Sequence, residues 1–90
     1  MKKFLKSTDG YYFPSEGVLA LDATDSNDVV INVKGLAGTA TSDTLTLDGG
    51  SAGVPAKIAE AVIEEINFGK QVVISLKDVH AEVTAVAYAD

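Results

Sequence analysis

One segment of this chain has the spacing of an amphipathic helix, and that single segment limits the folds available to the sequence. Residues 55–68 place Ile58, Val62 and Ile66 on one side at helical intervals, with charged and polar residues on the other side. The segment begins with a proline, which suits the first helical position, and Gly69 follows it as a C-cap. The pattern predicts one helix over residues 55–68.

The other patterned segments alternate apolar and polar residues with a period of two, as strands with one buried face do. The clearest is residues 28–34, where Val29, Ile31 and Val33 share a face. Alternation, unlike a continuous apolar run, favours antiparallel pairing, and the last two strands are close enough in sequence to form a hairpin. The expected strands are residues 18–22, 28–34, 44–48, 71–77 and 82–89.

The N-terminal part, residues 1–17, is either an arm or an edge strand. Residues 1–6 are basic and partly apolar, and Asp9-Gly10 signals a turn. The aromatic run that follows ends at Pro14, which restricts it to an edge strand or an ordered loop. With 90 residues the chain has room for a single domain, residues 1–90.

The resulting order is β-β-β-α-β-β, with or without a further N-terminal strand, so the fold class is mainly β with one helix (α+β). Short strands with one helix fit a small, strongly bent antiparallel sheet or a partly open barrel, with the helix covering a face or closing an end. A domain this small buries only about 60–65% of its unfolded surface. Oligomerisation is therefore the expected source of further stability.

Composition excludes several chemistries. The chain has no cysteine, so disulfides, thiol catalysis and cysteine zinc sites are excluded. Its 13 acidic residues against 7 basic ones give a net charge of −6, which disfavours non-specific phosphate binding. No apolar run approaches the roughly 20 residues of a membrane span, and no apolar segment follows the N-terminal lysines as in a signal peptide. We expect a soluble protein, not secreted by a signal peptide, with no membrane partner.

The segment 22–28 gathers oxygen ligands at short spacing, as a calcium-binding loop does. The glycine and the closing glutamate of an EF-hand are missing, and the same residue types make ordinary turns. A plain turn is the favoured interpretation, and no metal site is assigned. The residues in question are Asp22, Asp25, Asn27 and Asp28.

No other cluster predicts catalysis. His80 is the one histidine, in a short turn beside two acidic residues, and no nucleophile is placed next to it. Glu60 and Glu64 are neighbours on the predicted helix, where a solvated face explains them. The glycine-rich loop 49–53 lacks the GxxxxGK[ST] spacing of a phosphate-binding loop. We assign no catalytic or cofactor-binding residue, expect no cofactor, and predict that the protein is not an enzyme.

Two groups of residues are candidates for contact with partners. Lysines bind phosphates and aromatic rings stack on bases, whereas aromatic residues without basic neighbours are more typical of packing anchors or subunit contacts. The candidate nucleic-acid contacts are Lys2, Lys3, Lys6, Tyr11, Tyr12 and Phe13. The last strand is apolar on both sides, and its candidate subunit-interface residues are Val83, Val86 and Tyr88.

The succession of segments DVVINV, TLTL, AKIAEAVIEEIN, VVISLKDV and VTAVAYA resembles a family of small marine phage proteins. These proteins are abundant in ocean metagenomes and are linked to phages of cyanobacteria, and some look like Sm-like barrels that form rings and bind nucleic acid. The resemblance covers about residues 18–89 and implies a strongly bent five-stranded sheet in an open Sm-like barrel. It also implies a cyclic homo-oligomer in which edge strands pair between subunits.

The sequence departs from the Sm pattern in two respects. Sm proteins place a helix before the first strand, whereas the predicted helix of this chain lies between strands. Their RNA-contacting loop carries an arginine–glycine pair, and this chain has no arginine. No binding residue is therefore transferred from the family.

Two functions follow as expectations. The first is a non-enzymatic, homo-oligomerising phage-type protein, either a virion component or an assembly accessory, found in the host cytoplasm or the virion. The alternative is an Sm-like ring that binds single-stranded RNA or DNA.

Overall fold

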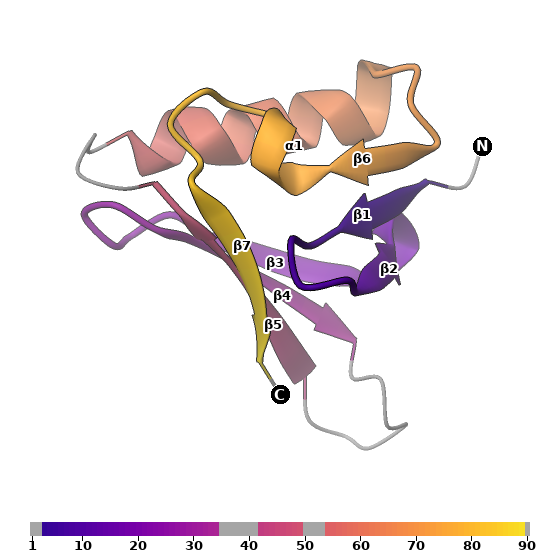
Figure 1. The fold of residues 1–90 in the computed structure, drawn as a ribbon, viewed down its shortest axis with the longest axis horizontal. Helices are drawn as coiled ribbons and strands as arrows, with labels where there is room; N and C mark the ends of the chain where they lie inside the picture. Colours follow the sequence, from indigo (N-terminus) through magenta and orange to yellow (C-terminus); the bar gives the residue numbers. More distant parts are fainter. Residues whose placement is uncertain (1–2, 35–41, 50–53, 90) are drawn as a thin grey trace.

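The computed structural model describes residues 3–34, 42–49 and 54–89. Within these ranges the chain forms seven strands in two sheets and one α-helix (Figure 1). The elements are β1 (Phe4–Lys6), β2 (Tyr12–Pro14), β3 (Val18–Asp22), β4 (Val29–Lys34), β5 (Ser42–Asp48), α1 (Pro55–Phe68), β6 (Val73–Ser75) and β7 (Ala85–Ala89). Two 3-10 turns, Ser15–Gly17 and Leu76–Asp78, follow β2 and β6.

The smaller sheet has the order β2-β1-β6 and mixes both strand directions. β1 pairs antiparallel with β2, where Leu5 lies opposite Phe13, and parallel with β6, where Leu5 lies opposite Ile74. The parallel pair arises because the chain returns to this sheet only after it has crossed the larger sheet and α1. Parallel strands need such a long crossover, whereas antiparallel strands can be joined by a tight turn.

The larger sheet is antiparallel throughout, in the order β3-β4-β5-β7. Leu45 in β5 lies opposite Ile31 in β4 and Tyr88 in β7. The pairing of β3 with β4 contains an irregularity between Val18 and Ala20, and Leu19 at that point is largely exposed.

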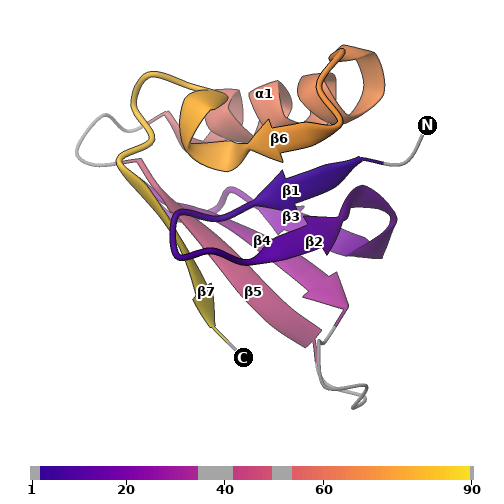
Figure 2. The same ribbon diagram turned by 45° about the vertical axis from the view of Figure 1, so that its right-hand side comes forward.

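The core lies between the two sheets and α1, which runs across one end of the molecule above β6 (Figure 2). Period-two alternation supplies the buried face of each strand, and α1 contributes Ile58, Ala59 and Val62 from one side. The remaining fully buried or nearly buried apolar residues are Leu5, Phe13, Val29, Ile31, Val33, Leu45, Leu47, Ile74, Leu76, Val83 and Val86.

The helix prediction is confirmed from Pro55 to Phe68, and Gly69 is its C-cap. The φ of Gly69 is −69°, which any residue can adopt, so the backbone angle does not require glycine. Glycine is needed because a Cβ at this position would lie 2.7 Å from the carbonyl oxygen of Glu65. The α+β class is also confirmed, but the strands form two open sheets and not one bent sheet.

The predicted hairpin of the last two strands is wrong. β6 joins the smaller sheet beside β1, and β7 joins the larger sheet beside β5. The predicted strand 71–77 shortens to Val73–Ser75 because the chain turns into a 3-10 turn that inserts Leu76 into the core. The two strands thus lie in different sheets, and both contribute buried residues, Ile74 and Val86, to the core between the sheets.

Candidate functional site

The lysines predicted to contact nucleic acid have different environments. Lys3 is buried, with 6% of its surface exposed, and its Nζ donates to the carbonyl oxygens of Glu65, at 2.8 Å, and of Gly69. It therefore satisfies the C-terminal end of α1, where carbonyls lack helical partners and a positive charge is favourable. Lys6 is half-buried, with Nζ 5.8 Å from the centre of the Tyr12 ring. Lys2 lies outside the described residues.

The aromatic run divides between core and surface. Phe13 is 2% exposed and belongs to the core. Tyr11 packs on Tyr88 with ring centroids 4.2 Å apart, and Phe13 stacks on the same ring at 5.5 Å. Tyr12, at 51% exposure, is the member of the run most open to a partner.

The three residues predicted at a subunit interface lie mostly inside the fold. Val83 and Val86 are core residues with 3% and 0% exposure, so their side chains are not available to a second copy. Tyr88 is half-buried, and its hydroxyl donates to Oδ2 of the buried Asp43 at 2.7 Å. The alternation of β7 leaves only alanines on its exposed face.

The outer edge of β7 is covered by the turn between β1 and β2. The Thr8 N–H and hydroxyl donate to the Val86 carbonyl oxygen at 3.0 and 2.8 Å, and the Val86 N–H donates to the Thr8 hydroxyl at 3.1 Å. The Tyr88 N–H donates to Oδ2 of Asp9 at 3.0 Å. Hydrogen bonds from the Ser7 hydroxyl and then the Tyr88 N–H hold the pKa of Asp9 below its usual value. We call these contacts the edge latch, because they occupy groups that an open edge strand offers to other chains.

The acidic loop considered for calcium uses its carboxylates within the turn. Asp22 accepts from the hydroxyl and N–H of Thr24 at 2.6 and 2.9 Å, and these bonds lower its pKa. Asp25 accepts from the N–H groups of Asn27 and Asp28 at 2.9 and 3.1 Å, with the same effect on its pKa. In the described part of the chain, no three His, Cys, Asp or Glu residues are grouped as metal ligands.

His80 has a local structural contact, since its Nδ1 accepts from the N–H of Glu82 at 3.1 Å. The bond resembles the side-chain-to-backbone contacts by which short polar residues close turns. This hydrogen bond holds the imidazole ring of His80 within the turn, where the sequence analysis places it.

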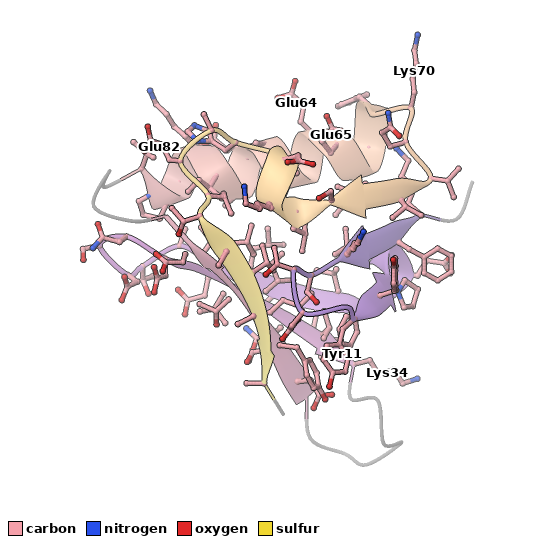
Figure 3. The ribbon with its side chains drawn as sticks, viewed as in Figure 1. Tyr11, Lys34, Glu64, Glu65, Lys70 and Glu82 are labelled. Carbon is pink, nitrogen blue, oxygen red and sulfur yellow. The ribbon has the colours of Figure 1, made fainter. Side chains whose placement is uncertain are left out.

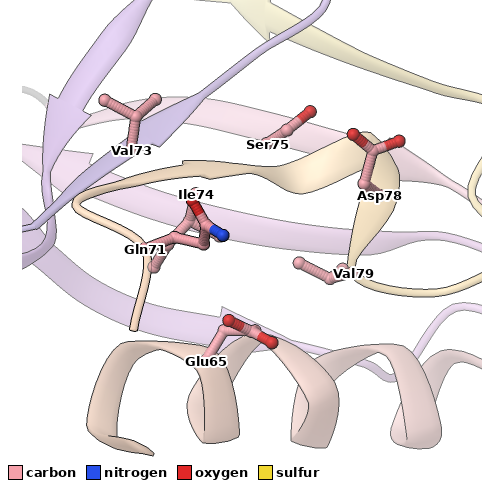
Figure 4. Close-up of a pocket in the computed structure, with 7 residues that line it drawn as sticks. All are labelled: Glu65, Gln71, Val73, Ile74, Ser75, Asp78 and Val79. Atoms are coloured by element: carbon pink, nitrogen blue, oxygen red, sulfur yellow. The ribbon is translucent and has the colours of Figure 1, made fainter. Parts of the chain in front are cut away.

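Two adjacent pockets open between α1 and the segment β6 to Val79. The larger has a volume of about 320 Å³ and the smaller about 270 Å³, and both are lined by Glu65 and Val79. In Figure 4 the Glu65 side chain points from α1 toward β6, and Gln71 and Val79 lie in the space between them. The larger pocket is also lined by Val73, Ile74, Ser75 and Asp78, and the smaller by Ala61, Glu64, Phe68 and Gly69.

Exposed apolar side chains gather beside these pockets. Phe68 is 81% exposed at the end of α1, and Val72 and Val73 are 49% and 45% exposed on the way into β6. We call these three residues the apolar patch. The sequence analysis does not predict this patch, since it places Val72 and Val73 in a strand over residues 71–77 and Phe68 at the end of the helix 55–68. The one signal was that Phe68 lies outside the Ile58–Val62–Ile66 side of the helical pattern.

No protein-family model, curated protein or solved structure matches this chain. Across residues 3–34, 42–49 and 54–89, no helix has the length and apolar character needed to cross a membrane.

Proposed function

We propose that the protein is a non-enzymatic assembly protein that forms a cyclic homo-oligomer, and that its copies associate through the apolar patch. The observation that carries this proposal is the exposure of three large apolar side chains, Phe68, Val72 and Val73, in the short segment that leads from the end of α1 into β6. Single exposed apolar residues are ordinary, whereas several in one short segment that lines a recess, as Phe68 and Val73 do, are typical of interaction sites.

The energetic reason is the small core. A domain of this size has a thin stability margin, and fully burying one large apolar side chain contributes about 1.5–3 kcal/mol. Burying the patch between copies would add hydrophobic stabilisation that the isolated chain lacks. The edge latch also fits this proposal, because it blocks pairing at β7 and leaves the patch as the better contact.

The test is sedimentation equilibrium across a wide protein concentration range, with the double variant Phe68→Ser/Val73→Ser. We expect a concentration-dependent oligomer for the natural chain and a shift toward monomer for the variant. Leu19→Ser is the matched control, because Leu19 is 62% exposed on β3 and is not part of the patch. A natural chain that stays monomeric at every concentration would remove the proposal, as would equal effects of both variants.

The alternative, a ring that binds single-stranded nucleic acid, has one favourable observation. Lys6 and the exposed Tyr12 place a cation against an aromatic face, a pair suited to a phosphate and a stacked base. It predicts binding of a fluorescent oligothymidylate that weakens with salt and with Lys6→Ala. Binding that is absent at low salt, or unchanged in that variant, would count against it.

A further inference from the structure

The larger pocket lies along the edge of β6 that β1 does not use. The N–H of Phe4 donates to the carbonyl oxygen of Val72 at 2.8 Å, and alternate residues of a strand direct their backbone groups to the same neighbour. The backbone groups of Val73 therefore face the opposite edge. Figure 4 shows β6 between β1 and α1, so that edge faces the helix across the pocket.

The pocket combines an apolar wall with acidic groups. Val73 and Val79 provide aliphatic surface, and Glu65 provides a carboxylate that points toward β6, whereas the carboxylate of the lining residue Asp78 points away from α1 (Figure 4). No lysine is among the residues that line either pocket, and Lys70 at the end of the helix extends away from the molecule (Figure 3). The smaller pocket adds Glu64 to the same acidic stretch.

We infer that this pocket binds a lysine side chain of a protein partner. A lysine side chain has an aliphatic stem and a compact ammonium group, so the stem matches the apolar wall and the ammonium matches the Glu65 carboxylate, which points from α1 toward β6 (Figure 4). The volume of about 320 Å³ lies at the small end of the range for ligand sites, about 300–1,000 Å³, and leaves room for a lysine side chain. The Val73 backbone groups offer hydrogen bonds to the main chain on either side of that lysine.

This inference does not rest on self-association through the apolar patch, but Val73 belongs to both surfaces, so a bound segment and a second copy would compete for it. The partner is a short extended segment with lysine between apolar residues. Charge favours it over a second copy, because this chain has a net charge of −6 and would bring further carboxylates to an acidic recess.

The test uses ¹⁵N-labelled full-length protein titrated with the capped peptide acetyl-Ser-Val-Lys-Val-Ser-amide and followed by chemical shifts. The matched peptide carries norleucine in place of lysine, which keeps the stem and removes the charge. We expect the lysine peptide to bind about threefold to tenfold more tightly, the range of one or two partly exposed ion pairs. Shifts should concentrate on Gln71, Val73 and Ser75.

The double variant Glu65→Gln/Asp78→Asn should remove the preference for lysine, and Glu60→Gln, on the same helix but outside both pockets, should keep it. Equal binding of the two peptides, or a preference that survives the double variant, overturns the inference. Butylammonium binding as tightly as the lysine peptide would overturn the assignment to a protein partner. The oligomeric state of each variant, measured in parallel, separates this outcome from a failure of the assembly proposal.

Discussion

Replacement of Thr8 by valine tests the edge latch, because valine keeps the shape of threonine and removes its hydroxyl. The substitution eliminates the bond from the Thr8 hydroxyl to the Val86 carbonyl oxygen, at 2.8 Å, and the bond it accepts from the Val86 N–H, at 3.1 Å. The backbone bond from Thr8 N–H to the same carbonyl, at 3.0 Å, remains. Only the side-chain part of the latch is therefore lost.

Each net hydrogen bond contributes about 0.5–1.5 kcal/mol, so the loss of two predicts a decrease of about 1–2 kcal/mol in the free energy of unfolding. The lower part of the summed range applies because Thr8 is exposed and water replaces part of the lost bonding. For a domain of 60–100 residues, each kcal/mol lowers the melting temperature by about 4–8 °C. The Val86 N–H on the edge of β7 also becomes available to other chains, which favours aggregation.

Urea unfolding followed by circular dichroism measures the first effect, and an unchanged m-value would show that the compactness of both states is preserved. Thr8→Ser is the control, since serine retains the hydroxyl. A Thr8→Val protein as stable as the natural chain, or a Thr8→Ser protein destabilised to the same extent, would refute the role assigned to the hydroxyl.

Three further predictions follow from other contacts. Lys3→Met should lower stability by about 1–3 kcal/mol in urea unfolding, because it retains the stem but removes the donor to the Gly69 carbonyl oxygen, whereas the Glu65 carbonyl oxygen keeps the Gly69 N–H; no loss would contradict the capping role. Folding lowers the pKa values of Asp22 and Asp25. Their contribution to the free energy of unfolding is therefore complete above the ordinary pKa of 3.8, and it is lost as the pH falls through the lower pKa values of the folded state. Asp22→Asn should therefore flatten the acid side of a stability–pH curve, and an unchanged curve would contradict this. Gly49→Ala should cost about 1–3 kcal/mol in thermal melts, because a Cβ would lie 2.2 Å from the carbonyl oxygen of Asn27; unchanged melting would rule out this close approach.

Local patterns in the sequence were enough to predict the helix and the later strands, but they left residues 1–17 open between an arm and an edge strand and did not predict the pairing, in which β1 is the middle strand of the smaller sheet. The helix 55–68 and the buried face Val29–Ile31–Val33 follow from periodicity, which depends only on near neighbours in the chain. Periodicity shows that a strand has a buried face and does not show which sheet buries it. Proximity in sequence was therefore the only basis for predicting a hairpin of residues 71–77 and 82–89. In the structure the two segments belong to different sheets.

The candidate site depends on that unpredicted pairing. The larger pocket exists because β6 lies beside β1 and leaves its other edge facing Glu65 on α1. Lys3 gave no signal of its role either, since its acceptors at the end of α1 are distant in sequence. Both features are products of tertiary contact, which residue types and spacing along the chain do not encode directly.

The parallel pairing of β1 with β6 has a consequence for the order of folding. Leu5 lies opposite Ile74, so the smaller sheet is completed by residues from near the two ends of the described chain. Contacts between such distant residues form slowly, because a long loop must close before they contribute. During synthesis on the ribosome, β1 and β2 emerge first as a pair of three-residue strands, too short to be stable alone. They remain without β6 until α1 and the segment after it have left the exit tunnel.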